Sequence, residues 1–202
     1  YQDPIWLTPN TPAALVAIAK TKAYFFDGPI GSYEDPTTSP PTKWIFVAAR
    51  RGGRVIYAFD VTNPEQPVLK WKKSNADLVN LGQTWSLPVA FKLTGVADPF
   101  LVFGAGYDPG EDSTPIVSTP GLGRGIYVLN ANTGALLRFI SNSSNAGAVT
   151  SPIASDMAFL AKIAASGGFG DVYRGYVGDM DGNVWRLDIP DSTPANWKLW
   201  RF

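Results

Sequence analysis

The sequence contains no histidine and no cysteine among its 202 residues. Histidine is the side chain most often used as a general acid or base near neutral pH, and cysteine supplies thiolate nucleophiles, disulfides and iron–sulfur ligands. Enzymes and metal sites that depend on either residue are therefore excluded. The serines occur in no G-x-S-x-G motif and have no histidine base, so the sequence offers no nucleophilic triad.

Charge is also scarce. Charged residues make up 17% of the chain, whereas a typical soluble domain has roughly 25%. The 17 basic residues equal the 17 acidic ones in number, and no basic stripe is present to neutralise phosphates, so we expect no nucleic-acid partner. No apolar run approaches the roughly 18 residues of a membrane helix, so we also expect no membrane span.

Glycine, proline and aromatic residues are abundant. The chain has 20 glycines, 17 prolines and 13% aromatic residues, and 45% of it is hydrophobic. This composition favours short strands and tight turns around a sizeable core. We expect an all-β fold with one or two short helices at 11–20 and 155–168, where a Thr-Pro start or a Ser/Asp cap precedes apolar spacing.

Three stretches share the order strand, glycine-rich turn, strand, polar turn, strand. They begin at KWIFVAARRGG, PFLVFGAGYD and VYRGYVGDMDG, and their matching polar positions are Asp60, Asn130 and Asp188. Repeats of three or four strands are typical of propeller blades. The chain is thus predicted to be a partial β-propeller of about three antiparallel blades. These blades span residues 22–73, 83–140 and 148–202, and residues 1–21 lead into the first.

Each predicted blade begins with an innermost strand. These strands are expected within 22–30, 83–93 and 148–155. Two segments rich in proline, serine and threonine, 31–42 and 108–123, are predicted to be long loops.

The polar turns resemble the docking pattern A-x-D-x-x-T-G-x-x-x-W of quinoprotein-like propellers. The three copies read AFDVTNPEQPVLKW, VLNANTGALLRF and RLDIPDSTPANW. In this pattern the polar side chain bonds the backbone of the turn and the aromatic residue packs over the next blade. The residues predicted to form this structural motif are Asp60, Trp71, Asn130, Gly134, Trp185 and Asp188.

Five motifs narrow the resemblance further. YFFDGPI, RRGGRVIYAFDVTNPEQPVLKW, LVFGAGYDPGEDS, GRGIYVLNANTG and YVGDMDGNVWRLDI resemble, in order and wording, the PilY1/PilC family of type IV pilus tip-associated adhesins. The resemblance implies an extracellular, calcium-modulated β-propeller, exported through the periplasm and outer membrane. It also implies a place at the pilus tip, in pilus biogenesis, retraction control and surface adhesion, with minor pilins and a host or abiotic surface as partners.

The chain departs from this family in two respects. Family propellers have about seven blades, and about three cannot close a ring, so we expect the remaining blades to come from the same or another chain. The sequence would then be a fragment, a split half or the ordered part of a longer protein. The Asp-rich loop common before the Y-x-G-D strand is replaced by an apolar segment that keeps only Asp156 and Asp171.

The turn GDMDGN is one candidate calcium site. Asp179, Asp181 and Asn183 match the first three ligand positions of a calcium loop. However, the glycine falls too early and an apolar strand follows at once. The alternative is an Asp-Gly hairpin turn.

The loop GYDPGEDS is the other candidate. Asp108, Glu111 and Asp112 offer hard oxygen ligands that could hold Ca²⁺ together with backbone carbonyls. The alternative is a solvated turn.

The leading interpretation is a non-catalytic binding and scaffold module. One alternative is a quinone-dependent dehydrogenase, which shares the propeller type but needs pyrroloquinoline quinone, usually calcium, and an aspartate base. Another is a scaffold of the outer-membrane assembly type. Trp71, Trp185 and Trp197 are expected to pack between blades, whereas Trp6, Trp85 and Trp200 are left open to core packing or to stacking on sugars.

Overall fold

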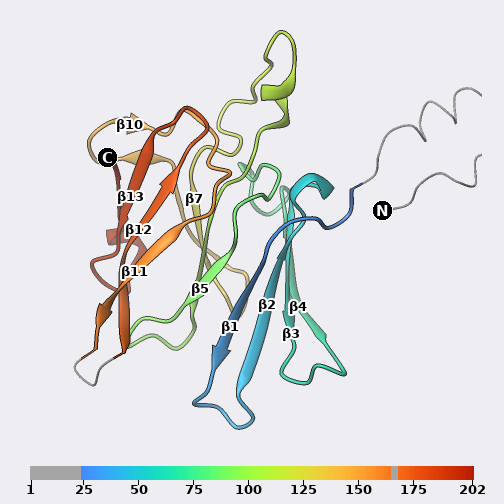
Figure 1. Ribbon diagram of the computed structural model, residues 1–202, viewed down its shortest axis with the longest axis vertical. Helices are drawn as coiled ribbons and strands as arrows, with labels where there is room; N and C mark the ends of the chain where they lie inside the picture. Colours follow the sequence, from blue (N-terminus) through green and yellow to red (C-terminus); the bar gives the residue numbers. More distant parts are fainter. Residues whose placement is uncertain (1–23, 165–167) are drawn as a thin grey trace, which may run out of the picture.

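Strands dominate the architecture of the chain (Figure 1). The computed structural model describes residues 24–164 and 168–202. Within these ranges the chain forms fourteen β-strands and three short 3-10 helices. None of the helices in the described part of the chain is long and apolar enough to cross a membrane. The fold is therefore all-β, as predicted.

The first sheet is an antiparallel meander in the order β1-β2-β3-β4. Its strands are β1 (Ile30–Asp35), β2 (Thr42–Ala48), β3 (Val55–Asp60) and β4 (Val68–Ser74). The helix η1 (Arg50–Gly52) lies in the turn from β2 to β3. Alternate residues of β2, including Phe46, are buried on one face, because successive side chains of a strand point to opposite sides.

The second sheet has the order β5-β6-β7-β8. Its strands are β5 (Val89–Phe91), β6 (Phe100–Gly104), β7 (Ile126–Asn130) and β8 (Leu136–Ile140). Every residue of β6 is buried, which requires cover on both faces of the sheet. The helix η2 (Pro109–Asp112) lies in the long loop between β6 and β7.

The third sheet has the order β10-β9-β14-β13-β12-β11, with a single parallel pairing between β14 and β9. Its strands are β9 (Asn142–Ser143), β10 (Gly147–Ala148), β11 (Ala158–Ile163), β12 (Phe169–Gly178), β13 (Val184–Asp188) and β14 (Lys198–Arg201). The helix η3 (Pro194–Asn196) connects β13 to β14.

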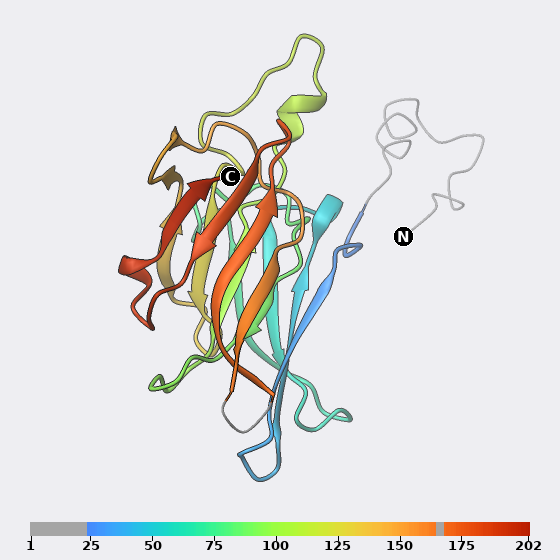
Figure 2. The ribbon, with the colours of Figure 1, turned by 60° about the vertical axis from the view of Figure 1, so that its left-hand side comes forward.

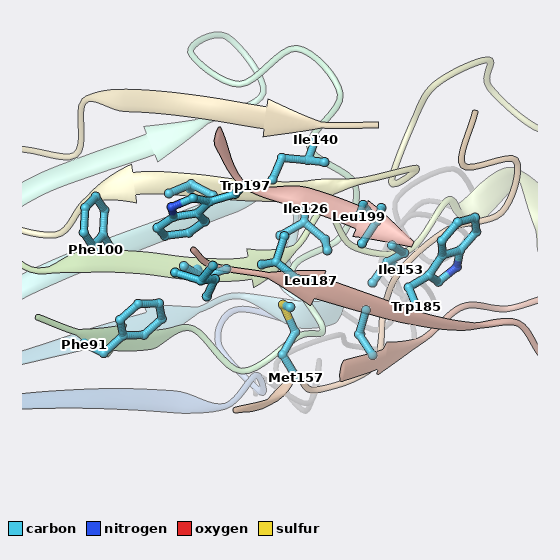
Figure 3. Close-up of a cluster of buried hydrophobic side chains, with 14 of the residues drawn as sticks. Phe91, Phe100, Ile126, Ile140, Ile153, Met157, Trp185, Leu187, Trp197 and Leu199 are labelled. Carbon is cyan, nitrogen blue, oxygen red and sulfur yellow. The ribbon is translucent and has the colours of Figure 1, made fainter. Parts of the chain in front are cut away.

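Two hydrophobic cores lie on opposite sides of the second sheet. Phe46 and Ile56 of the first sheet pack with Leu101 of the second sheet in one core. Phe100 packs with Leu187 of the third sheet in the other core, which Figure 3 shows in close-up. The neighbouring positions 100 and 101 thus face different sheets. The three sheets are layered side by side as a portion of a β-propeller (Figures 1 and 2).

One end of the layered sheets carries the two longest connections, residues 75–88 and 105–125, and we call it the loop end. It comprises the turns after β2, β6 and β12 and the segments before β5 and β11. The 108–123 loop rises from this end in both views, on the side of the molecule opposite the β1–β2 turn (Figures 1 and 2).

Several predicted elements differ from the structure. The helix predicted at 155–168 is wrong, because Ala158–Ile163 forms β11 and pairs antiparallel with β12. Pairing with a neighbouring strand here overrides the local helical spacing. The other predicted helix, at 11–20, lies outside the described residues.

The first strands of two blades are also displaced from their predicted places. Strand β1 begins at residue 30 and runs into the predicted loop 31–42, where Tyr33 pairs with Trp44 across the sheet. Residues 149–155 form an irregular segment, and the strand follows it as β11. In the second sheet, β5 lies within the predicted range 83–93.

Candidate functional site

The acidic turn at 179–183 joins β12 to β13. Gly178 pairs with Val184, and Gly182 adopts a φ of 80°, a conformation that glycine allows without steric cost. The Asp179 carboxylate accepts hydrogen bonds at both oxygens: Oδ1 from the Asn183 amide at 2.9 Å and Oδ2 from the indole Nε1 of Trp185 at 2.8 Å. The turn therefore uses this carboxylate to fix a buried tryptophan.

The other residues of the turn complete the same arrangement. The backbone N–H of Asp181 donates to Asp179 Oδ1 at 3.0 Å, and the Asn183 side-chain amide donates to Oδ2 at 2.8 Å. Asp181 itself is exposed. The three candidate ligands thus share one hairpin, and the carboxylate at its start is already saturated with donors.

The 108–123 loop contains a buried carboxylate. Asp108 is 1% exposed. Its Oδ1 accepts from the Gly110 amide at 3.0 Å, and its Oδ2 accepts from the Thr119 amide at 2.7 Å. The same oxygen lies 3.3 Å from Nη1 of Arg124. Asp108 therefore ties the start of the loop to its end.

Arg124 is the centre of this network. Its Nη2 lies 2.7 Å from Glu111 Oε1, and its Nη1 and Nε donate to the backbone oxygens of Leu122 and Thr150 at 2.8 and 2.7 Å. The Arg124 side chain is only 11% exposed. A planar guanidinium presents five donors in a fixed fork, and this one holds the loop against the segment that leads into the third sheet.

Asp112 is the third acidic residue of this loop and has a different partner. Its Oδ1 accepts from the Tyr107 hydroxyl at 2.6 Å. This hydrogen bond, together with burial and the neighbouring carboxylates, raises the pKa of Tyr107 to about 12. Within residues 24–164 and 168–202, no group of three acidic side chains is placed to hold a metal ion. Calcium binding at either candidate cluster stays a prediction.

The matching polar residues of the first two repeats cap their turns. Asp60 Oδ1 accepts from the Thr62 amide at 2.9 Å, and its Oδ2 accepts from the Trp44 indole at 3.3 Å. Burial alone would raise the pKa of Asp60, but these hydrogen bonds outweigh it and lower the pKa. Asn130 Oδ1 accepts from the Thr133 amide at 3.0 Å. Both side chains therefore bond the backbone of the turn that follows them.

Trp71 spans the first and second sheets. It belongs to β4, yet its Nε1 donates to the backbone oxygen of Ala131 at 3.0 Å. Gly134 lies against its ring, since an added Cβ there would approach Trp71 Cδ2 to 2.8 Å. The tryptophan of one sheet thus packs over the polar turn of the next, which requires a glycine at this contact.

The third repeat distributes these roles differently. Asp188 pairs with Arg174 at 2.9 Å and with Arg186 at 3.0 Å. The turn is capped instead by Asp191, whose Oδ1 accepts from the Thr193 amide at 2.7 Å. The role expected of Asp188 therefore falls to Asp191, three residues later.

The tryptophans also divide into two groups. Trp185 is 2% exposed and Trp197 is fully buried, with its ring 5.2 Å from that of Phe100 (Figure 3). Trp85 and Trp200 are partly buried. Trp6 lies outside the described residues.

Two structural residues were missed from the sequence. Arg124 stands in a GRG turn that, read alone, suggests only a basic loop. One signal was available in the sequence. The 108–123 loop contains three acidic residues and no basic one, and Arg124 follows it directly. Asp191 was missed because Asp188 occupies the position that matches Asp60 and Asn130 in the other two repeats.

The chain is similar in sequence to known proteins. No family model matches the chain. The chain is 27% identical over 142 residues to the type IV pilus biogenesis factor PilY1 of Pseudomonas aeruginosa strain UCBPP-PA14, covering 70% of this chain and 11% of that protein. It is 28% identical over 179 residues to the PilY1 homolog of Xylella fastidiosa strain Temecula1, covering 87% of this chain and 13% of the relative.

One solved structure shares the fold. The crystal structure of the Pseudomonas aeruginosa PilY1 C-terminal domain matches with a TM-score of 0.57 and 22% identity, over 88% of this chain and 33% of that one. Repeated antiparallel sheets that are layered side by side define the class of partial β-propellers. Within that class, the chain is similar in sequence to the PilY1 proteins, and this similarity supports membership of the PilY1 family. It spans only 11 to 13% of the length of these curated relatives.

Proposed function

We propose that this chain is a non-catalytic binding and scaffold module of a type IV pilus-associated protein that acts in pilus biogenesis and surface adhesion. The observation that carries the proposal is the similarity to proteins named type IV pilus biogenesis factors over 70 to 87% of the chain, in a shared fold. A layered scaffold with its long loops gathered at one end suits contact with partners, and such contact requires no catalytic group.

The proposal includes a location and partners. The module would act at the cell surface, at the pilus tip, after export through the periplasm and outer membrane. Its partners would be minor pilins, a host or abiotic surface, and the remaining propeller blades, from the same or another chain.

Removal of this module tests the pilus role. We expect an in-frame deletion of residues 24–202 from the full-length protein to lower the amount of pilin sheared from the cell surface, while total cellular pilin stays unchanged. Reintroduction of the intact coding sequence should restore surface pili. Normal surface pili and normal attachment in the deletion strain, with the shortened protein present at its usual level, would contradict the proposal.

A separate experiment tests the proposal that the module is not a quinone-dependent enzyme. Purified chain is mixed with pyrroloquinoline quinone and Ca²⁺, and the absorbance spectrum is recorded before and after gel filtration. We expect the quinone to elute separately from the protein. A protein-bound quinone spectrum with alcohol- or sugar-dependent reduction would favour a dehydrogenase, whatever the outcome of the pilus experiment.

Calcium binding by the 108–123 loop is tested by titration calorimetry. The Arg124 guanidinium already pairs with both Asp108 and Glu111, so it competes with any cation for their oxygens. We expect Arg124→Gln to bind Ca²⁺ more tightly than the unaltered chain. Equal affinities would show that these carboxylates are not the ligands.

A further inference from the structure

A pocket of about 250 Å³ opens at the loop end. It is lined by Trp85, Tyr107, Asp112, Ala154 and Met180. These residues come from the segment before β5, the β6–β7 loop, the segment before β11 and the β12–β13 turn. Pockets for drug-sized ligands measure about 300–1,000 Å³, so this one suits a single side chain.

Trp85 forms an aromatic wall of this pocket. Its ring lies edge-on to the Tyr107 ring at 6.0 Å, and its Nε1 donates to Gln83 Oε1 at 3.1 Å. The guanidinium of Arg50 lies 4.1 Å from the centre of the indole ring, yet Arg50 does not line the pocket. The Trp85 indole therefore contacts the Arg50 cation outside the pocket, and it also contributes to the pocket wall.

Met180 provides a second apolar wall. Its side chain is 54% exposed at the tip of the β12–β13 turn. Methionine is flexible and polarisable, and it adapts to the shape of an apolar partner. An alkyl chain that enters the pocket would thus meet an aromatic ring and a thioether.

Asp112 supplies the charge. Its Oδ1 accepts from Tyr107, but no ion pair in the described residues includes Asp112. By contrast, Asp108 and Glu111 in the same loop are both paired with Arg124. The pocket therefore combines apolar walls with one carboxylate that has no cationic partner among the described residues.

We propose that this pocket binds the side chain of a lysine or arginine presented by a partner protein. The alkyl stem would pack against Trp85 and Met180, and the cation would pair with the carboxylate of Asp112. Basic side chains combine an apolar stem with a charged end, which matches the apolar walls and the carboxylate of the pocket. The pocket would bind a basic side chain whether or not the chain acts in a pilus.

The chain contains a built-in reporter for this test. It has two methionines: Met180 lines the pocket, whereas Met157 is 6% exposed in the core between the second and third sheets. With methyl-labelled methionine, NMR titration follows both sites at once. The probes are the Nα-acetyl amides of lysine, arginine, glutamine and glutamate, and methyl glucoside.

We expect the lysine and arginine derivatives to shift the Met180 methyl signal in a saturable way and to leave Met157 unchanged. Added salt should weaken both titrations, because the pairing carboxylate is exposed to solvent. Equal binding of the glutamine derivative, preferential binding of the glucoside or of the acidic derivative, or no saturable shift with either basic probe would each overturn the proposal.

Two variants separate pairing from general electrostatics. Asp112→Asn keeps an acceptor for the Tyr107 hydroxyl but loses the charge, and we expect about fivefold weaker binding of the lysine derivative, as for an exposed ion pair. Asp181→Asn removes another exposed acid next to Met180 that does not line the pocket. Equal effects of the two substitutions would refute the role of Asp112. An unchanged Met157 signal verifies the fold of both variants.

Discussion

Replacement of Arg124 by alanine is the most direct test of how the loop end is held together. The guanidinium connects Asp108, Glu111 and three backbone oxygens. Arg124→Ala removes all of these contacts. It leaves Asp108, 1% exposed, without its cationic partner, while Glu111 can regain water because its side chain is 26% exposed.

The magnitude follows from this difference in burial. Removal of one partner from a buried ion pair costs about 3–5 kcal/mol. Since only one of the two acids is fully buried, we expect the lower end, about 3 kcal/mol in the free energy of unfolding. For a chain of this size, that corresponds to a fall in Tm of about 6–12 °C.

The assay is urea denaturation followed by tryptophan fluorescence, with a double-mutant cycle. We expect Asp108→Asn to reduce the cost of Arg124→Ala, because the buried charge is then absent, and the two substitutions should therefore not be additive. Digestion with a non-specific protease should cut the 108–123 loop faster in Arg124→Ala. A loss below about 1 kcal/mol, or strict additivity of the two substitutions, would refute the reasoning.

Three further predictions concern the cores and the turns. Trp185→Ala should destabilise the chain by about 3–5 kcal/mol in the same assay, and Trp185→Phe by less, since it loses chiefly the indole hydrogen bond; a neutral alanine variant would contradict the buried placement. Gly134→Ala, at φ 71° and against Trp71, should cost about 2–3 kcal/mol. Gly147→Ala, at φ 74° with open space around it, should cost less, and equal losses would show that contact with the ring is irrelevant. Burial raises the pKa of Tyr127 from 10.0 to about 12. The neutral phenol therefore contributes its full stabilisation below pH 10, and this stabilisation is lost as the pH rises through 12. A urea midpoint that stays constant between pH 10 and pH 12 would contradict this prediction.

The sequence was informative where a pattern repeats. Alternating apolar residues flanked by glycine-rich and polar turns recur three times, and this period alone predicts layered antiparallel sheets. The cap at Asn130 and the contact of Trp71 with the following turn were also predictable, because each obeys a local spacing rule. Local spacing is enough to predict a contact when the partner of a side chain lies in the same turn or in the matching turn of the next repeat.

Prediction was weaker where long-range contacts decide the structure. Residues 158–163 have helical spacing, yet the edge of β12 offers them backbone partners, so they form a strand. Arg124 gains its importance from Asp108, 16 residues earlier, and from Thr150, 26 residues later. No local pattern encodes those distances, because these contacts depend on where the paired strands place the two ends of the connecting loop.

The second sheet has a further consequence for how the molecule unfolds. Because β6 is buried on both faces, each hydrophobic core uses this sheet as one of its two walls. Unfolding of the second sheet would therefore expose both cores at once. The three sheets should therefore behave as one thermodynamic unit with a single transition, in contrast to a string of independently melting repeats. A polar substitution in the central sheet should weaken directly the core that its side chain faces and, by disturbing the shared sheet, should also loosen the other core. Substitutions in either outer sheet should act first on the one core that they line.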